Sequence, residues 1–371
     1  MPMLDRRLIK NFDFYLLLLV LTLCVVGTVT LYSATHIMEE LADPLYYVRR
    51  QLLVTCCGLV AMLIVCFIDY INFQNWSRYL YLGSIALLAL VLVMGSVRKG
   101  SMRVIPIGFF DLQPSEIAKF VLIVMLAKLL ADREGHFHSL QDLVPSLLAT
   151  ALPMGLILLQ PDLGTALVFL AILAGMFYVA GVKKREMLIL AATVLVAAPL
   201  AWFFVLHDYQ KMRLMVFLNP GMDPTGTGLQ LLQSMIGIGS GGLFGKGLFE
   251  STQARLRFLP EHHTDFIFSV FGEEMGFIGA VALLLLFFLL IYRILWIATH
   301  AKDQFGALIC VGVAVMFTFQ ILVNIGMTIS VMPVTGIPLP FISYGNNAMI
   351  VNLLSIGLVL NVGMRRHKIQ F

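Results

Sequence analysis

Long apolar stretches, separated by short polar ones, repeat along almost the whole chain. Most are about as long as the 17–25 residues that an α-helix needs to cross a bilayer. The pattern therefore predicts an all-α polytopic membrane protein with about ten transmembrane helices. The expected spans are residues 14–33, 48–68, 77–96, 115–131, 143–159, 163–181, 186–206, 265–295, 306–331 and 346–364.

The eighth stretch is longer than one crossing and contains two neighbouring acids, Glu273 and Glu274. Carboxylates at membrane depth are costly unless they face other polar groups or water. We therefore expect residues 276–295 to cross the lipid, and residues 265–275 to line a wet cavity at its outer side.

Lysine and arginine are unevenly distributed among the segments that connect these stretches. With the N-terminus inside, the inner segments hold fourteen of them and the short outer segments hold five. Because the cytoplasmic loops of membrane proteins carry the excess of positive side chains, we expect both termini to be cytoplasmic. The polar segment 207–264 is then a large extracytoplasmic loop between spans seven and eight. Residues 1–371 form a single integral membrane domain in this interpretation.

Composition agrees with a membrane protein and excludes an ordinary soluble domain. The chain is 60% hydrophobic and 12% charged, with a mean hydropathy of +0.92, whereas soluble domains are about 25% charged. The formal net charge of +4 is modest, and we expect no nucleic-acid partner. The five cysteines lie inside apolar runs without metal-ligand spacing, so we expect neither disulfides nor a zinc site.

Polar chemistry is densest where the eighth span begins, in the stretch Leu259-Pro-Glu-His-His-Thr-Asp-Phe-Ile-Phe268. It places Asp265 and His263 at the mouth of a membrane helix, where ionisable groups are usually functional. We predict that Asp265 is catalytic and that His263 orients it or binds a substrate. A metal ligand set is a weaker interpretation, because adjacent histidines on one segment seldom close a metal shell alone.

Two other spans open with a shared pattern, Gln113-Pro-Ser-Glu116 and Gln160-Pro-Asp162. A proline at the first helical position and an acid in the first turn both suit a helix start, so Glu116 and Asp162 could simply cap helices. Lys119 follows Glu116 by three residues and shares its helix face. A Glu–Lys pair one turn inside the membrane favours a polar cavity that binds substrate. Both interpretations stay open.

Five basic residues depart from the charge rule by lying in the short outer segments. They are Arg49, Arg50, Arg98, Lys99 and Arg103, and the long segment 207–264 adds Lys211, Arg213, Lys246, Arg255 and Arg257 to the same face. The even-numbered spans also begin at the outer face, where helix N-termini favour anions. These residues would contact lipid headgroups in one interpretation. In the other, Arg103 helps to bind an anionic substrate.

A glycine-rich run, Gly237-Ile-Gly-Ser-Gly-Gly-Leu-Phe-Gly-Lys-Gly247, has some likeness to a nucleotide loop. A P-loop requires glycine where Ser240 stands, and serine or threonine where Gly247 follows Lys246. ATP hydrolysis is therefore not expected. We interpret the run as a flexible loop over a lipid headgroup, with Lys246 as a phosphate contact.

Five motifs together resemble the SEDS family (shape, elongation, division and sporulation), in an order and spacing that cover nearly the whole chain. Within the family the chain is most similar to the elongation branch, the RodA proteins. It departs from the usual pattern after Ser-Tyr-Gly, where Asn346-Asn347 replaces Gly-Ser. The motifs are Gln113-Pro-Ser-Glu-Ile-Ala-Lys119, Gln160-Pro-Asp-Leu-Gly-Thr165, Gln233-Ser-Met-Ile-Gly-Ile-Gly-Ser-Gly-Gly242, Leu259-Pro-Glu-His-His-Thr-Asp-Phe266 and Pro338-Leu-Pro-Phe-Ile-Ser-Tyr-Gly345.

The resemblance implies a peptidoglycan glycosyltransferase of the bacterial inner membrane, with its active site on the outer face. Such proteins polymerise lipid II during cell-wall elongation, beside a class B penicillin-binding protein that crosslinks the strands. Other elongation-complex membrane proteins and membrane lipids are further implied partners. The essential aspartate falls on Asp265, the polar pair on Glu116 and Lys119, and the acid of the sixth span on Asp162. Ser343, in the fifth motif, is expected to bind substrate.

The residues suit that chemistry. The acceptor hydroxyl needs a base, which Asp265 supplies, and the leaving undecaprenyl pyrophosphate needs positive charge from Lys119, Arg103 and Lys246. The sequence specifies no cofactor, although a divalent cation, Mg or Mn, would ease the electrostatics. The alternative function is a lipid II flippase. Transporter sites usually lie at the bilayer midplane between inverted repeats, whereas these polar residues gather at the outer ends of the spans, which favours the enzyme.

Overall fold

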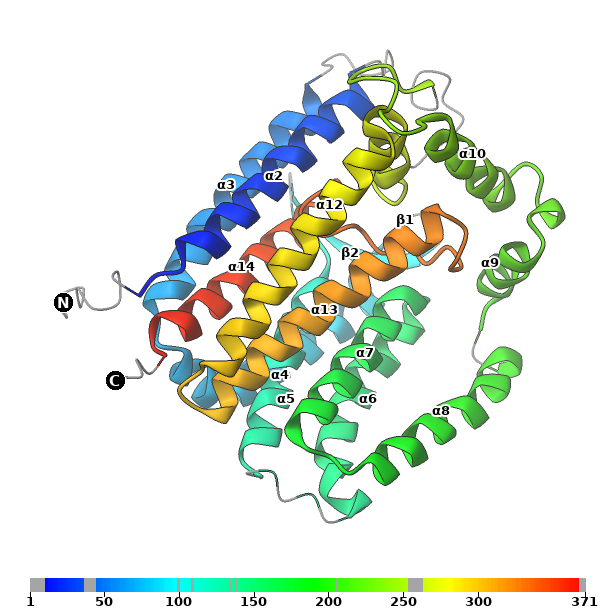
Figure 1. The fold of residues 1–371 in the computed structure, drawn as a ribbon. Helices are drawn as coiled ribbons and strands as arrows, with labels where there is room; N and C mark the ends of the chain where they lie inside the picture. The colour runs from blue at the N-terminus through cyan, green and yellow to red at the C-terminus, as the bar shows by residue number, and fades with distance from the viewer. Residues whose placement is uncertain are drawn as a thin grey trace.

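The computed structural model describes residues 11–36, 45–98, 101–107, 110–133, 135, 137, 139–204, 206–252 and 263–366. Long helices run side by side through most of the molecule (Figure 1). Those that correspond to the predicted spans are α2 (Phe14–Thr35), α3 (Tyr46–Phe67), α4 (Tyr70–Met94), α5 (Pro114–Ala131), α6 (Val144–Leu159), α7 (Leu163–Ala180), α8 (Lys184–Phe204), α12 (Ile267–Thr299), α13 (Gln304–Thr328) and α14 (Asn346–Met364).

The prediction of a helical membrane protein is confirmed. Within the described ranges, nine helices are long and apolar enough to cross a membrane. Helix α5 has 18 residues but carries Glu116, Lys119 and Lys128, so it is set apart from those nine by its charge. The third helix begins at Tyr70, seven residues earlier than predicted. The Asp69 carboxylate explains this start, because it caps the helix by accepting from the Ile71 N–H at 3.1 Å.

Three short antiparallel strands between α4 and α5 were not predicted. They are β1 (Ser96–Arg98), β2 (Ser101–Ile107) and β3 (Phe110–Leu112), in the order β1-β2-β3. Ser96 pairs with Val104, and Ile105 pairs with Leu112. Strands this short carry too little periodicity to be recognised in a sequence. The sheet leads the chain from the end of α4 to the start of α5.

The predicted extracytoplasmic loop 207–264 is more ordered than its composition indicates. It contains α9 (Asp208–Leu218), a short 3-10 turn (Pro220–Met222) and α10 (Thr227–Ser240). In Figure 1 α9 and α10 lie to one side of the main bundle, and α8 leads toward them. Residues 253–262 of this loop lie outside the described ranges.

Helices α13 and α14 form the centre of the bundle. In their most apolar windows, 72% of the residues of α13 and 83% of those of α14 are buried. None of the residues of α8 is buried. The described residues nearest the two ends of the chain lie together, since the Asn11 amide donates to the Met364 carbonyl at 3.5 Å. The first and last described parts of the chain therefore lie on one side of the bundle, as a cytoplasmic location of both termini requires.

The prediction that residues 265–275 line a wet cavity is wrong for Glu273 and Glu274. These side chains are 0% and 2% exposed. The Glu273 carboxylate accepts from Lys246 Nζ at 2.6 Å and from Ser251 Oγ at 2.6 Å, and Glu274 accepts from Ser33 Oγ. Protein donors replace water around both carboxylates, which is how buried charges are tolerated.

Main-chain hydrogen bonds hold the end of the glycine-rich run against α12, so this segment is not a flexible loop. We call residues 242–247 the glycine-rich clasp. Helix α12 is interrupted at Gly276, which has φ 64° and ψ −164°. The interruption leaves main-chain groups without helical partners, and residues 242–247 bond them. Gly247 N donates to the Glu274 carbonyl at 3.0 Å, and Phe277 N donates to the Gly242 carbonyl at 2.9 Å. A Cβ on Gly276 would lie 2.3 Å from Gly245 N, so glycine serves close approach here.

We expect Gly276→Ala to destabilise the protein. Its backbone conformation is essentially restricted to glycine and costs another residue about 1–3 kcal/mol, to which the clash with Gly245 N is added. The measurement is thermal unfolding in detergent. Gly239→Ala is the matched control in the same glycine-rich run, since a Cβ there meets nothing within 4 Å. Equal unfolding temperatures for the two variants would contradict the clasp.

Candidate active site

A cleft of about 380 Å³ opens where four helices begin. Gln113 precedes α5, Asp162 precedes α7, Asp265 lies just before α12, and Asn346 opens α14; all four residues line the cleft. Helix N-termini carry partial positive charge and free N–H groups, so they attract anions. The expectation that the even-numbered spans start on one face is met by these four helices, which converge on a single cavity.

The predicted pair of Glu116 and Lys119 is present. Lys119 Nζ lies 2.8 Å from each carboxylate oxygen of Glu116. The two side chains are 4% and 2% exposed, yet both border the cleft. One helical turn separates them, which explains how α5 carries two charges among apolar neighbours. Each charge is paired with the other in a place where a lone charge would be costly.

Asp162 both caps α7 and borders the cleft. Its carboxylate accepts from the Thr165 N–H at 3.1 Å and from Thr165 Oγ1 at 2.9 Å. Arg103 Nη1 lies 3.8 Å from the same carboxylate. The Arg103 guanidinium also donates to the Pro161 carbonyl at 2.6 Å. Capping, one of the two readings left open by the sequence, therefore coexists with a place in the cleft.

Asp265 lies in the turn that leads into α12 and borders the cleft. An ideal Cβ on Gly336 would lie 3.6 Å from Asp265 Oδ2, so the carboxylate lies beside the loop of residues 335–338, which also borders the cleft. Tyr344 borders the cleft beside them. Burial raises the pKa of the Tyr344 hydroxyl, against the opposing effect of the Arg50 guanidinium, so the hydroxyl stays protonated near neutral pH.

Ser343 and His263, which were predicted to bind substrate, lie near Asp265 but do not border the cleft. The Ser343 hydroxyl donates to the Thr264 carbonyl at 2.7 Å and accepts from Leu339 N at 2.8 Å. It is 4% exposed and does not border the cleft. The His263 ring packs 4.9 Å from the Tyr47 ring. Both residues contact the protein around Asp265 rather than the cavity itself.

Lys246 is not brought together with the other predicted residues. It does not border the cleft, and its ammonium bonds the buried carboxylate of Glu273. The clasp explains this position, because it draws residues 242–247 onto the interrupted part of α12. Glu261, His262, Arg255 and Arg257, which the sequence also suggested for this region, lie outside the described residues.

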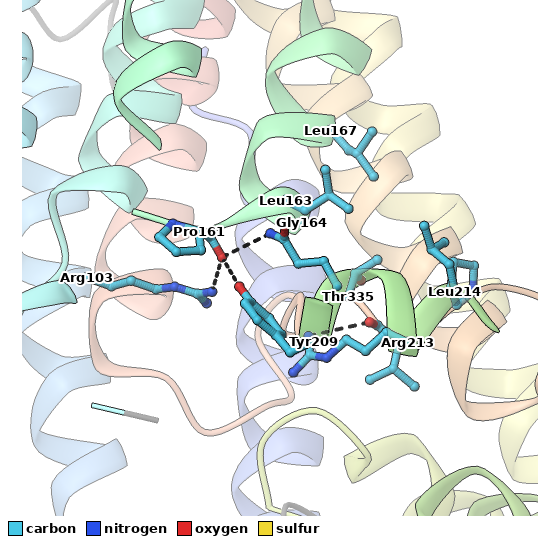
Figure 2. A pocket seen from close by; sticks show the side chains of 12 residues that line it. Arg103, Pro161, Leu163, Gly164, Leu167, Tyr209, Arg213, Leu214 and Thr335 are labelled. Carbon is cyan, nitrogen blue, oxygen red and sulfur yellow. Dashed lines mark hydrogen bonds between the residues drawn. The ribbon is translucent and has the colours of Figure 1, made fainter. Parts of the chain in front are cut away.

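Helix α9 brings Tyr209 and Arg213 to the cleft. Sequence reasoning counted Arg213 among the basic residues of the outer face but missed Tyr209. Figure 2 shows them beside Arg103 around an adjoining pocket of about 60 Å³. The Tyr209 hydroxyl and Arg103 both donate to the Pro161 carbonyl. The only sequence signal was the position of Tyr209 in a long loop with unusual composition, since loop residues lack the periodicity that assigns a side chain to a face.

The departure from the family pattern leaves the start of α14 intact. Asn346 is its first residue, and the Asn347 amide donates to the Asp111 carbonyl at 2.7 Å. Asn347 thereby ties α14 to strand β3. A divalent cation stays an untested prediction: among the residues that the structure describes, no three His, Cys, Asp or Glu side chains come together as ligands.

Comparison with known proteins identifies the family. A family model for FtsW, RodA and SpoVE, described as "cell cycle protein", matches residues 14–368. The chain belongs to this family. The peptidoglycan glycosyltransferase MrdB of Escherichia coli K12 is 41% identical over 339 residues, 90% of each chain. The family is the one that the five motifs predicted.

Solved structures agree with the family assignment. A chain of a peptidoglycan synthase complex that coordinates polymerization and crosslinking superposes with a TM-score of 0.82 at 34% identity, covering 96% of this chain and 99% of that one. The rod shape determining protein RodA of Thermus thermophilus has a TM-score of 0.72 at 32% identity, covering 96% and 98%. The FtsW/RodA/SpoVE fold therefore extends over nearly the whole chain.

Neutralising one member of the Glu116–Lys119 pair should destabilise this family member strongly. Glu116→Gln and Lys119→Met each leave one buried charge without its partner, which costs about 3–5 kcal/mol. We expect the double variant to lose less than the sum of the two single losses, because no charge is then left alone. Thermal unfolding of the four proteins measures the coupling. Strictly additive losses would show that the pair is not coupled.

Proposed function

We propose that this protein is a peptidoglycan glycosyltransferase that polymerises lipid II into glycan strands, with Asp265 as the general base. The observation that carries the proposal is the position of the Asp265 carboxylate in a cleft that also holds Lys119, Arg103 and four helix N-termini. A base and an anion site in one cavity are what glycosyl transfer from a lipid pyrophosphate requires. The name of the E. coli relative supports the same activity.

The reaction would use the two parts of the cleft together. Asp265 takes the proton from a sugar hydroxyl of the acceptor as the oxygen attacks the anomeric carbon of the donor sugar. The bond between that carbon and the phosphate oxygen breaks, and undecaprenyl pyrophosphate leaves with the bonding electrons. A positioned general base typically contributes about 10²–10⁴-fold to the rate. The proton ends on the Asp265 carboxylate.

The anion site would act on the leaving group. Charged side chains at the cleft are balanced, because Arg103, Lys119 and Arg213 face Glu116, Asp162 and Asp265. The helix N-termini therefore tip the local potential toward positive. Fixed donors that meet charge as it develops stabilise a transition state more than they stabilise the neutral ground state. The departing pyrophosphate is where such charge develops.

Location and partnership follow from the same proposal. The chain is an integral membrane protein of a family named for FtsW, RodA and SpoVE. Lipid II polymerisation at the outer face of the inner membrane fits the predicted topology. The similar solved complex coordinates polymerization and crosslinking, which supports a class B penicillin-binding protein as the crosslinking partner. The similarity to RodA and MrdB supports a role in cell-wall elongation and cell shape.

Asp265→Asn tests the base. The amide keeps the shape of the carboxylate but cannot accept the proton, so we expect polymerisation to fall by about 10²–10⁴-fold while the unfolding temperature changes little. The measurement is glycan polymer formed from lipid II by the purified protein with its partner. Asp69→Asn is the control, an aspartate that caps α4. Wild-type polymer from Asp265→Asn would sink the assignment. Lipid II movement without polymer in the wild type would favour a flippase.

Arg103→Gln tests the anion site. Loss of the guanidinium should weaken the use of lipid II, seen as a higher KM or a lower kcat/KM, while membrane insertion stays normal. Lys184→Ala is the matched loss of a positive charge at the start of α8, away from the cleft. We expect that variant to retain wild-type turnover. Equal effects of the two changes would indicate general destabilisation and remove Arg103 from the site.

A further inference from the structure

The turn that carries Asp265 is held by its main-chain carbonyls. Ser269 N donates to the Phe266 carbonyl, so the hydrogen bonding of α12 begins at Phe266. The three carbonyls before it accept from other elements. His263 O accepts from Tyr344 N at 3.1 Å, Thr264 O from Ser343 Oγ at 2.7 Å, and Asp265 O from Asn324 Nδ2 at 3.0 Å. Three successive peptide units are thereby bonded to other elements.

Asn324 lies on α13, in the centre of the bundle, and is 0% exposed. Its amide nitrogen has two hydrogens to donate. It donates to Asp265 O and also to the Ile337 carbonyl at 2.8 Å. Ile337 belongs to the loop of residues 335–338, which borders the cleft beside Asp265. A single amide group therefore joins the Asp265 turn to this neighbouring loop.

The side-chain oxygen of Asn324, Oδ1, indicates why an asparagine stands at this position. This oxygen is buried and has no hydrogen-bond partner among the residues that the structure describes. Buried polar groups are nearly always bonded, and an exception calls for an explanation. An apolar side chain of similar size would pack at this position without placing an unpaired acceptor in the bundle. The two bonds donated by Nδ2 are what an asparagine supplies there and an apolar residue cannot.

We infer that Asn324 is a positioning residue for catalysis, which fixes the Asp265 carboxylate against the loop of residues 335–338, with Ser343 in the same role one peptide earlier. The inference rests on the proposed function of Asp265 and adds the groups that aim it. Neither side chain borders the cleft, so each acts through Asp265 rather than on substrate. A carboxylate in a turn, outside any helix or strand, needs such a frame to hold one direction.

The test replaces Asn324 with leucine, which has similar volume and no donor. The Asp265 turn and the loop of residues 335–338 then lose the hydrogen bonds that Asn324 donates to both of them. Since a shift of about 1 Å can cost about 10²-fold in rate, we expect kcat for lipid II polymerisation to fall about 10–100-fold. KM should stay within about threefold, because the cleft residues that meet substrate are unchanged. Purified protein with its partner and lipid II gives both constants.

Asn361→Leu is the matched control. Asn361 is also 0% exposed, and its amide also donates to two carbonyls, those of Val65 and Ile68. It lies thirteen residues along α14 from Ala348 at the cleft, a distance of about 20 Å. Both variants should lower the unfolding temperature, and only Asn324→Leu should lower kcat. An equal loss of kcat in both would show that Asn324 is merely structural.

A double variant separates the inference from the proposed function. If Asn324 works through Asp265, Asn324→Leu should cost nothing further in the Asp265→Asn background. Multiplied losses would overturn the positioning role. Full activity of Asp265→Asn would overturn the base and the positioning role together. An inactive Asp265→Asn beside a fully active Asn324→Leu would overturn only the positioning role.

A second variant covers the case in which Asn324→Leu does not fold. Ser343→Ala removes the bond to Thr264 O and should give the same selective fall in kcat. Its control is Ser355→Ala, which removes a buried hydroxyl that donates to the Val351 carbonyl within α14. Wild-type kcat in Ser343→Ala, or the same loss in both serine variants, would contradict the frame.

Discussion

Main-chain groups that leave a helix inside a membrane protein must find partners within the protein, because lipid offers none. This constraint accounts for much of the described structure around the cleft. Where α12 is interrupted at Gly276, the glycine-rich clasp bonds the freed groups. Where the chain turns into α12, Tyr344, Ser343 and Asn324 bond three successive carbonyls. The departures from helix are thus fixed features rather than loose ones.

Charge follows a related rule with two outcomes. The Glu273–Lys246 pair is enclosed by hydroxyl and amide donors and serves packing. The Glu116–Lys119 pair is more fully buried, because the Lys246 side chain is 28% exposed, and yet it borders the cleft. Both pairs avoid leaving a buried carboxylate without a partner, but only the second borders the cleft.

The helices around the cleft differ in how deeply they are buried. Helices α13 and α14 are the most buried of the spans, and they carry or adjoin the groups that hold Asp265. Helix α8 has no buried residue, and the segments that follow it bring Tyr209 and Arg213 to the cleft. The part of the site around Asp265 is therefore held by the most buried helices. The part around Tyr209 and Arg213 belongs to elements with few buried side chains.

The sequence by itself determined the membrane class, the approximate spans, the family, and five residues that the structure places around one cleft: Arg103, Glu116, Lys119, Asp162 and Asp265. Hydropathy is a local property, and helix starts carry local signals, so both can be recognised from the sequence alone. Even so, the neighbouring acids Glu273 and Glu274 were predicted to line a wet cavity and are instead buried. A sequence does not show which donors surround a carboxylate.

Only the tertiary structure decided which polar residues meet. Lys246 looked like a phosphate ligand and bonds Glu273 instead. Asn324 gave no signal, since one asparagine in an apolar helix is indistinguishable from a packing residue until its partners are known. Those partners are 59 and 13 residues away along the chain. Side-chain donors choose carbonyls by distance and direction in space, and neither quantity is encoded by spacing along the chain.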